Sequence, residues 1–147
     1  MDSIDLRLLK ELTKNARINI KDLADMVFLS SPAISARIEK LVNEKTIKGF
    51  HADIDFEKLG ADCVALVNYT AQRTLPENFS DFINEHPNIV ECYAVAGEYT
   101  HVMKVAFRTA KQLYKFVETL NKYGKTEVNI IMDKIKTSCD VEVDKIV

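Results

Sequence analysis

A length of 147 residues fits one domain or two small ones, and 47% hydrophobic with 29% charged residues is ordinary for a globular protein. No apolar stretch approaches the ~20 residues of a membrane span, and the acidic, amphipathic N-terminus is unlike a signal peptide, so a cytoplasmic protein without membrane contact is expected. A net charge of −2 argues against a nonspecific, highly basic nucleic-acid coat, whereas specific DNA binding depends on local charge.

The N-terminal part of the chain follows a helical period. A first helix is expected after a cap at Asp2 or Ser3, and a second after Asn19. A third is expected from about residue 31 to residue 44, capped by Ser30 or Ser31, with a proline in its first turn. The apolar residues of this third helix are spaced as on a buried helix face and are Ile34, Ile38, Leu41 and Val42.

Two short amphipathic helices joined by a tight turn, at about residues 20–40, are typical of a helix-turn-helix. Residues 47–54 then alternate apolar and polar side chains around Gly49, as a β wing would. Residues 31–48 hold four basic and two acidic residues, whereas residues 61–147 hold ten basic and twelve acidic residues. We therefore predict a winged helix-turn-helix domain over residues 1–54 whose partner is double-stranded DNA.

The second half changes period after a linker at residues 55–62. Strands are expected at residues 63–71, 90–96, 101–107 and 127–135, and helices at residues 78–85 and from Thr109 to a stop at Gly124. This order predicts a ferredoxin-like βαββαβ domain over residues 63–147, and hence an α+β chain. Such a sheet carries helices on one face only, so its other face needs a partner and self-association is expected.

Four segments stand in order along the chain: IDLRLLKEL, ARINIKDLA, LSSPAISARIEKLVNEKTIKGF followed by Leu59-Gly60, and AGEYTHVMKV. In this order and at these separations the chain resembles the Lrp/AsnC family, the leucine-responsive or feast/famine transcriptional regulators, over nearly its whole length. The resemblance implies a winged helix-turn-helix followed by an effector and oligomerisation domain of the RAM type. It also implies dimers that can assemble into octamers, a response to amino acids and association with the nucleoid.

The sequence departs from the family pattern in the turn and in the second domain. The turn between the DNA-binding helices carries Phe28 where the family usually has glycine; either Phe28 is left-handed, at a cost on the order of 1 kcal/mol, or the turn takes a different path. The effector loop usually reads Gly-x-x-Asp, but here Thr100 replaces the Asp, and the last strand has Ile131 and Asp133 in place of threonines. The DNA-binding prediction survives these changes, whereas the identity of a ligand does not.

The third helix and the segment after it supply the candidate DNA-binding residues. Small side chains let a helix sit deep in the major groove, where base edges are distinguishable. Arg37 either contacts a guanine or a phosphate, or forms a salt bridge within the chain, for example to a first-helix carboxylate. A solvated helix face is the alternative for Ser35, Arg37 and Lys40. The candidates are Ser30, Ser31, Pro32, Ala33, Ser35, Ala36 and Arg37, with Lys40, Lys48 and His51 expected at the phosphate backbone.

The loop at residues 97–100 is the candidate small-molecule site. Gly97 permits close backbone approach, while Glu98 and Thr100 offer partners for an ammonium or carboxylate group, as in an amino acid. Tyr123 and Asp133 join this cleft only if the end of the last helix and the last strand converge there. A plain hairpin turn at a subunit interface is the alternative. The candidate effector residues are Gly97, Glu98, Tyr99, Thr100, Tyr123 and Asp133.

No residue pattern indicates catalysis, a metal site or a cofactor. The three histidines are predicted on the surface or in turns, and Cys63, Cys92 and Cys139 are predicted to be structural, because neither set has metal-ligand spacing. The leading hypothesis is a sequence-specific transcriptional regulator tuned by a metabolite such as an amino acid. The alternatives are an architectural DNA-wrapping protein with little effector control and, in a different class, an enzyme or metabolite-binding α+β dimer.

Overall fold

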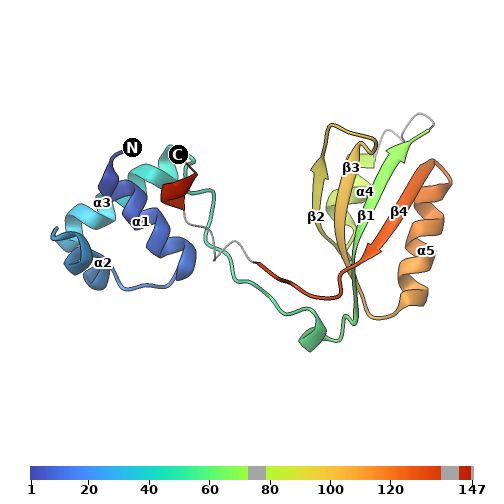
Figure 1. The fold of residues 1–147 in the computed structure, drawn as a ribbon, viewed down its shortest axis with the longest axis horizontal. Helices are drawn as coiled ribbons and strands as arrows, with labels where there is room; N and C mark the ends of the chain where they lie inside the picture. Colours follow the sequence, from blue (N-terminus) through green and yellow to red (C-terminus); the bar gives the residue numbers. More distant parts are fainter. Residues whose placement is uncertain (73–78, 137–142, 147) are drawn as a thin grey trace. The chain divides into compact units, whose positions relative to one another are not determined.

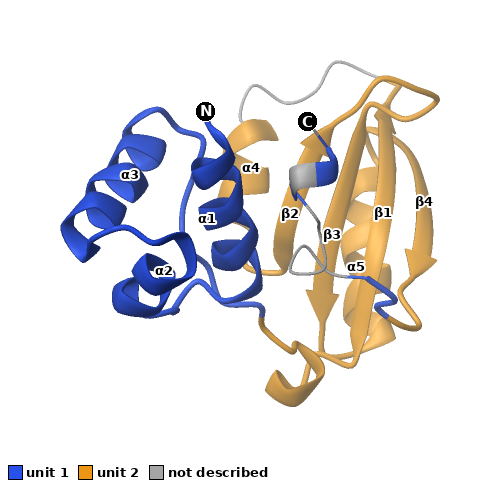
Figure 2. Ribbon diagram, turned by 60° about the vertical axis from the view of Figure 1, so that its left-hand side comes forward, with its two compact units in different colours: residues 1–53, 134–147 blue, residues 54–133 orange. Residues whose placement is uncertain are grey.

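The computed structural model describes residues 1–72, 79–136 and 143–146, and the chain forms two compact units. The first unit comprises Met1–Asp53 and Lys134–Val147, and the second comprises Ile54–Asp133 (Figures 1 and 2). The predicted structural cysteine at position 139 lies outside the described residues. Within the described part of the chain, no helix is long and apolar enough to cross a membrane.

Three helices build the first unit: α1 (Ser3–Lys14), α2 (Ile20–Val27) and α3 (Ser31–Asn43). Asp2 caps α1, Asn19 caps α2 and Ser30 caps α3, each side chain accepting a hydrogen bond from a backbone N–H of the first turn. These caps pair N–H groups that have no partner inside the helix. Ser31 is therefore the first residue of α3 rather than its cap, and the predicted helix-turn-helix is confirmed.

A small apolar core holds the three helices together. Leu8 of α1, Leu23 and Ala24 of α2, and Ile34 of α3 are each at most 3% exposed. Leu41, near the end of α3, is 2% exposed. Because this core buries one side of α3, the opposite side of that helix is left facing outward.

The predicted β wing is wrong. The structure assigns no strand to residues 47–54, all of which are described. A strand requires the hydrogen-bond ladder of a neighbouring strand, and the described part of the first unit contains helices and irregular segments only. Among the described residues of this unit, the alternating pattern of residues 47–54 therefore has no strand to pair with.

The predicted linker folds into a short turn. Asp55 Oδ1 accepts a hydrogen bond from the N–H of Glu57 at 3.1 Å and opens a 3-10 helix, η1 (Glu57–Leu59). Gly60 ends it with a φ of 79°, a left-handed conformation that glycine adopts without strain.

The C-terminal segment differs from the prediction that one domain covers residues 63–147. The second compact unit ends at Asp133, and Lys134–Val147 groups with the N-terminal helices. Lys134 Nζ lies 2.6 Å from Asp53 Oδ2, and a short 3-10 helix, η3 (Val143–Lys145), contacts α1. These contacts join positions far apart in the sequence, so the local residue pattern does not reveal them.

The second unit is a four-stranded antiparallel sheet with two helices. In chain order its elements are β1 (Cys63–Ala71), α4 (Phe79–Glu85), β2 (Ile89–Ala94), β3 (His101–Phe107), α5 (Ala110–Asn121) and β4 (Gly124–Ile130). The strands lie in the order β2-β3-β1-β4, so β1 pairs with both β3 and β4. This is the ferredoxin-like βαββαβ arrangement, and that prediction is confirmed.

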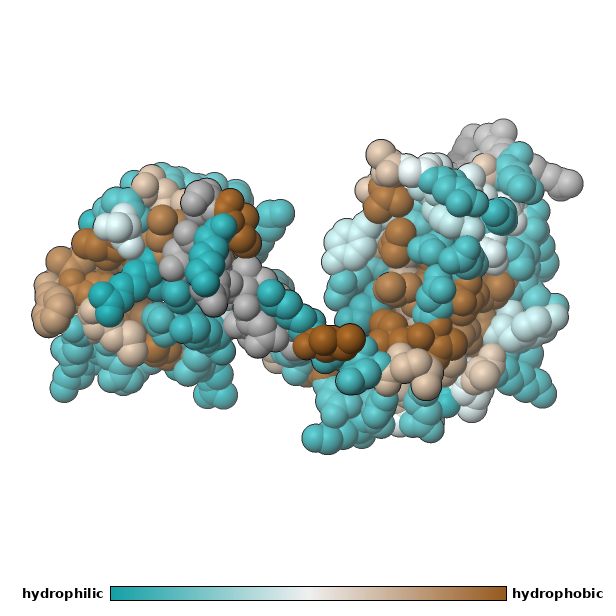
Figure 3. Space-filling view, in the orientation of Figure 1, coloured by the Kyte–Doolittle hydropathy of each residue, from teal (hydrophilic) through white to brown (hydrophobic). Residues whose placement is uncertain are grey.

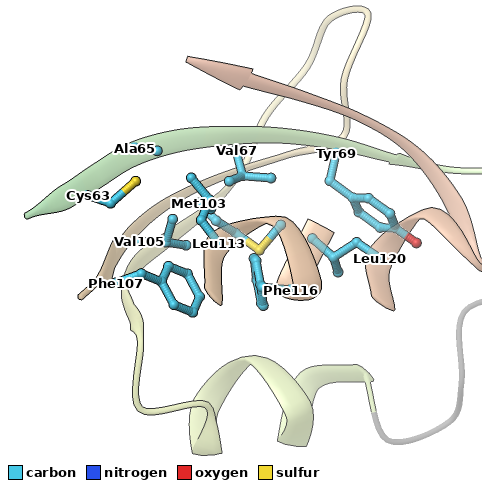
Figure 4. Close-up of a cluster of buried hydrophobic side chains, with 10 residues drawn as sticks. All are labelled: Cys63, Ala65, Val67, Tyr69, Met103, Val105, Phe107, Leu113, Phe116 and Leu120. Carbon is cyan, nitrogen blue, oxygen red and sulfur yellow. The ribbon is translucent and has the colours of Figure 1, made fainter. Parts of the chain in front are cut away.

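Both helices cover the same face of the sheet and bury a second apolar core (Figures 2 and 4). Val67 and Tyr69 of β1 and Met103 and Val105 of β3 are fully buried there, with side chains of α5 beneath them. Cys63 is buried in the same core as a free thiol, which agrees with a structural cysteine.

Two of the three histidines pack against aromatic rings: His86 lies in the turn between α4 and β2, which agrees with the prediction of surface or turn positions, whereas His101 is the first residue of β3. The centroid of the His86 ring lies 4.9 Å from that of Phe116, and the centroid of the His101 ring lies 5.5 Å from that of Phe79. Burial lowers the pKa of His86. Both rings thus belong to the packing between helices and sheet.

The last strand begins and ends earlier than predicted. Gly124 does not terminate α5, which ends at Asn121; it is the first residue of β4 and pairs with Ala71. A Cβ on Gly124 would lie 2.8 Å from Tyr69 Cε2 and closer still to the carbonyl oxygen of Thr70. The glycine therefore permits β4 to approach β1 at this point.

Among the described residues of the second unit, no helix covers the other face of the sheet (Figure 2). Leu66 and Tyr93 project from it and are 38% and 54% exposed, and apolar residues gather over this face in the space-filling view (Figure 3). Lys104, which also lies on this face, pairs with Glu91 at 3.6 Å and sits over the ring of Phe56. A sheet face that exposes apolar side chains among polar ones is typical of a protein–protein interface.

Candidate DNA-binding and effector sites

The outward side of α3 carries small side chains together with one basic residue, Lys40. Pro32, Ser35, Ala36, Glu39 and Lys40 are all exposed and lie on the side opposite Ile34 and Leu41. Lys40 Nζ is 3.8 Å from Glu44 Oε1, but both side chains are more than half exposed, so this ion pair is weak. Ser31 and Ala33, half-buried in the first turn, complete the N-terminal end of the helix.

Arg37 does not belong to this exposed surface. Its Nη1 donates to Asp5 Oδ1 at 2.7 Å and to Asp2 Oδ2 at 2.8 Å, so it joins α3 to the capping residues of α1. Asp5 is 5% exposed and also accepts from the N–H of Asp2 at 3.0 Å. Of the two interpretations open for Arg37, the structure shows the salt bridge to first-helix carboxylates.

This network makes the stability of the first unit depend on pH in the acid range. The hydrogen bond from the backbone N–H of Asp5, reinforced by Arg37, lowers the pKa of Asp2. An Asp with a lowered pKa stabilises the fold above its unfolded pKa of about 3.9, and this contribution is lost as the pH falls through the folded value. We expect the melting temperature of the wild type to fall more steeply between about pH 4 and pH 2 than that of Asp2→Ser, which keeps a capping oxygen. If circular dichroism shows the same dependence of melting temperature on pH for both proteins, this prediction is wrong.

Phe28 occupies the turn in the left-handed conformation. Its φ of 56° and ψ of 42° place it at the C-terminal cap of α2, and its side chain is 92% exposed. A non-glycine residue in this region costs roughly 1–2 kcal/mol. The turn therefore follows the usual path of a helix-turn-helix and accepts the strain, rather than taking a different path.

Lys48 and His51, predicted to contact the DNA backbone, are exposed on the segment after α3. They are not held on a β wing, because none forms. The ring of His51 lies against Gly49, and His51 Nε2 is closer to the position of a Cβ there than a van der Waals contact allows. Both side chains remain accessible to a phosphate, but their placement relies on an irregular segment.

The loop at residues 97–100 is held by hydrogen bonds to β1. The N–H of Thr100 donates to the carbonyl of Tyr69 at 3.0 Å, and the Thr100 hydroxyl donates to the same oxygen at 3.2 Å. Thr70 Oγ1 donates to the carbonyl of Glu98 at 3.0 Å. The Thr100 hydroxyl is therefore hydrogen-bonded to the backbone of β1.

The charged groups of the loop are paired with β4. Lys125 Nζ donates to Glu98 Oε1 at 3.0 Å, and this hydrogen bond raises the pKa of Lys125. The hydroxyl of Tyr99 donates to Glu127 Oε2 at 2.8 Å, which raises the pKa of Tyr99. Gly97 has no close neighbour: a Cβ there would meet nothing within 4 Å. Within this chain, close backbone approach does not explain that glycine.

The structure does not bring Tyr123 and Asp133 to the same place. Tyr123 precedes β4 at the end where Thr70 and the loop lie, since its carbonyl accepts from the N–H of Gln72 at 3.1 Å. Asp133 follows the opposite end of β4, two residues after Ile131, whose N–H donates to the carbonyl of Val64. Strands rise about 3.3 Å per residue, so the length of β4 separates Asp133 from the loop, and a shared site within one chain is excluded.

Three residues with chemistry suited to these sites were missed at the level of sequence. Glu39 stands in the exposed strip of α3, where a carboxylate can accept a hydrogen bond from cytosine N4. Lys125 and Glu127 reach the loop from β4. The helical period places Glu39 near Ser35, but the other two depend on strand register, which no local pattern reveals. Among the described residues, no group of three His, Cys, Asp or Glu side chains is arranged to hold a metal ion.

Two family models match the chain. An AsnC-type helix-turn-helix domain covers residues 1–42, and the Lrp/AsnC ligand binding domain covers residues 62–141, more than half of the chain. The chain belongs to the Lrp/AsnC family. Its relatives include the HTH-type transcriptional regulator LrpA of Bacillus subtilis, 30% identical over 91% of this chain and 99% of that protein. The family prediction from the sequence is confirmed.

Solved structures of Lrp/AsnC proteins have the same fold. The structure of B. subtilis LrpC matches with a TM-score of 0.84 at 28% identity, covering 93% of this chain and 98% of that one. A feast or famine regulatory protein from M. tuberculosis, complexed with L-methionine, matches with a TM-score of 0.84 at 26% identity over 92% of this chain and 95% of that one. As a member of the Lrp/AsnC family, the protein is a DNA-binding transcriptional regulator, and its relatives include HTH-type transcriptional regulators.

Proposed function

We propose that the exposed strip of α3 enters the major groove and reads the operator. The observation that carries this is the division of α3: Ile34 and Leu41 fasten one side to the core, while Ser35 and Ala36 leave the other side smooth enough for close approach to base edges. Lys40, Lys48 and His51 supply contacts to phosphates, which fix the register of the helix on DNA. Arg37 acts on DNA through its hold on α1 rather than by touching a base.

The test compares Lys40→Ala with Lys111→Ala, which removes an exposed lysine of the same charge from α5. A duplex selected in vitro from a random library with the wild-type chain serves as the probe. Each phosphate neutralised by the protein contributes about −0.9 to the slope of log K against log salt. We expect Lys40→Ala to reduce the slope by about one such contact, while Lys111→Ala leaves it unchanged. Equal slopes for both variants would exclude Lys40 from the interface.

We further propose that an amino acid binds at the loop of residues 97–100 and tunes the regulator. A zwitterion offers an ammonium group for Glu98 and a carboxylate for Lys125, two side chains that now pair with each other across the loop. The M. tuberculosis relative complexed with L-methionine shows that one member of the family takes such a ligand.

Thermal shift with each of the twenty amino acids tests this proposal. A ligand at 100 times its Kd stabilises the native state by about 2.7 kcal/mol, so a true effector raises the melting temperature. Lys125→Met should abolish the rise, while Lys122→Met, an exposed residue at the end of α5, should retain it. If none of the twenty amino acids raises the melting temperature, the alternative is favoured, an architectural DNA-wrapping protein without effector control.

Self-association completes the proposed function. The sheet face that carries Leu66 and Tyr93 has no helix to cover it, and a second copy of the chain can bury it. A dimer, and octamers built from dimers, would present several copies of α3 to adjacent grooves of DNA at the nucleoid. Sedimentation of wild type and Leu66→Lys tests this, since a charge placed on the interface should dissociate it.

A further inference from the structure

Phe28 combines a strained backbone with a side chain that the first unit does not use. Its φ of 56° lies where glycine is unstrained and other residues are not. The turn requires this conformation, because the N–H groups of Phe28 and Leu29 both bond to the carbonyl of Ala24 at the end of α2. Leu29 then enters the core beside α1 and α3.

The ring of Phe28 is not buried in the first unit, so its packing does not offset this strain. It is 92% exposed, more than any other phenylalanine or tyrosine side chain in the described part of the chain. Strained residues that persist without a structural benefit are concentrated at functional sites, and the reasoning runs from the observed outlier to the function. An exposed aromatic ring therefore calls for a partner outside this unit.

The position of Phe28 identifies that partner. It lies two residues before Ser30, the cap of α3, and is thus continuous with the N-terminal end of the helix proposed to enter the major groove. We propose that the Phe28 ring is a DNA contact, packing on the C5-methyl group of a thymine at the edge of the site read by α3. Phenylalanine makes such apolar contacts with thymine methyl groups. This proposal rests on the proposed role of α3 in DNA reading.

The proposal predicts opposite effects on stability and on binding. Phe28→Gly relieves the left-handed strain and loses no buried contact, so the protein should melt at a higher temperature, by about 5 °C. The same variant should bind the selected duplex about tenfold more weakly, because the apolar contact with the base is gone. A loss of affinity in a more stable protein cannot come from unfolding.

A second left-handed residue provides the matched control. Lys45, just after α3, has a φ of 60°, so Lys45→Gly relieves the same kind of strain without removing an aromatic ring. It should raise the melting temperature too, and reduce affinity for selected and random duplexes by the same factor, as loss of one charge does. Phe28→Gly should instead reduce the affinity for the selected duplex much more than the affinity for the random duplex.

Replacing single thymines of the selected duplex by deoxyuridine removes one methyl group at a time. The full-length wild type should lose affinity severalfold at one such position, and Phe28→Gly should be insensitive to that substitution. Equal affinities of the two proteins, or identical deoxyuridine profiles, would overturn the thymine contact. A change of oligomer mass in Phe28→Gly by sedimentation would assign the ring to a protein interface instead. If the wild type selects no sequence at all, the proposed function of α3 fails as well.

Discussion

Replacing Asp5 by alanine is expected to lower the free energy of unfolding of the first unit by about 2 kcal/mol. Asp5 is buried and accepts two hydrogen bonds, one from Arg37 of α3 and one from the N–H of Asp2. The substitution removes a charge-assisted hydrogen bond between helices and half of a capping box at once. Hydrogen–deuterium exchange of the amides of α1 and α3 measures the loss in this unit separately from the sheet.

The control for this prediction is Asp25→Ala, which removes an exposed carboxylate from α2 and should change stability by less than about 0.5 kcal/mol. In a double-mutant cycle, Arg37→Ala should cost less in the Asp5→Ala background than in the wild type, because the contact with Asp5 is already broken and only the hydrogen bond to Asp2 remains to be lost. Arg37→Ala alone should weaken DNA binding in proportion to its loss of folded protein. If it weakens binding with stability intact, Arg37 touches DNA directly and the positioning role is wrong.

The second large effect is expected at Gly124. Gly124→Ala places a methyl group 2.8 Å from Tyr69 Cε2 and closer to the carbonyl oxygen of Thr70, and a backbone atom cannot swing away as a flexible side chain can. Overpacking of this kind costs about 1–3 kcal/mol, and we expect the upper end, because β4 must shift along its pairing with β1. The loss of stability is measured by thermal unfolding, followed by the near-UV circular dichroism of Tyr69 and its neighbours.

Gly97→Ala is the matched glycine for comparison. A Cβ there meets nothing within 4 Å, and no left-handed φ is recorded for this residue, so alanine should not lower stability. Equal destabilisation by both substitutions would show that the sheet is sensitive to any loss of glycine rather than to the close approach at Gly124. The pair thus isolates the steric effect.

Local patterns were sufficient for most elements. Apolar spacing and capping residues located α1, α2 and α3, because a helix is stabilised by residues within one or two turns of each other. Strands β1 and β3 begin and end where the alternation of side chains predicts. The order of these elements then indicated the ferredoxin-like topology.

Errors arose where distant parts of the chain decide the outcome. Residues 47–54 have the alternation of a strand, but the structure assigns them no strand and gives them no pairing strand among the described residues. Tyr123 and Asp133 flank the same strand, and its extension holds them at opposite ends. The partners of Glu98 and Tyr99 on β4 follow from antiparallel register, which brings position 125 beside position 98 across β1.

The sequence by itself therefore predicted a helix-turn-helix whose second helix is α3, which begins at Ser31, because helix caps, apolar period and small exposed residues are local properties. Only the tertiary structure decided what Arg37 and Phe28 do. Arg37 is taken up by two carboxylates of α1, and Phe28 is left exposed in a left-handed turn. Both outcomes depend on how the three helices pack, since a charge meets its partner and a ring finds cover only through contacts between residues distant in the chain.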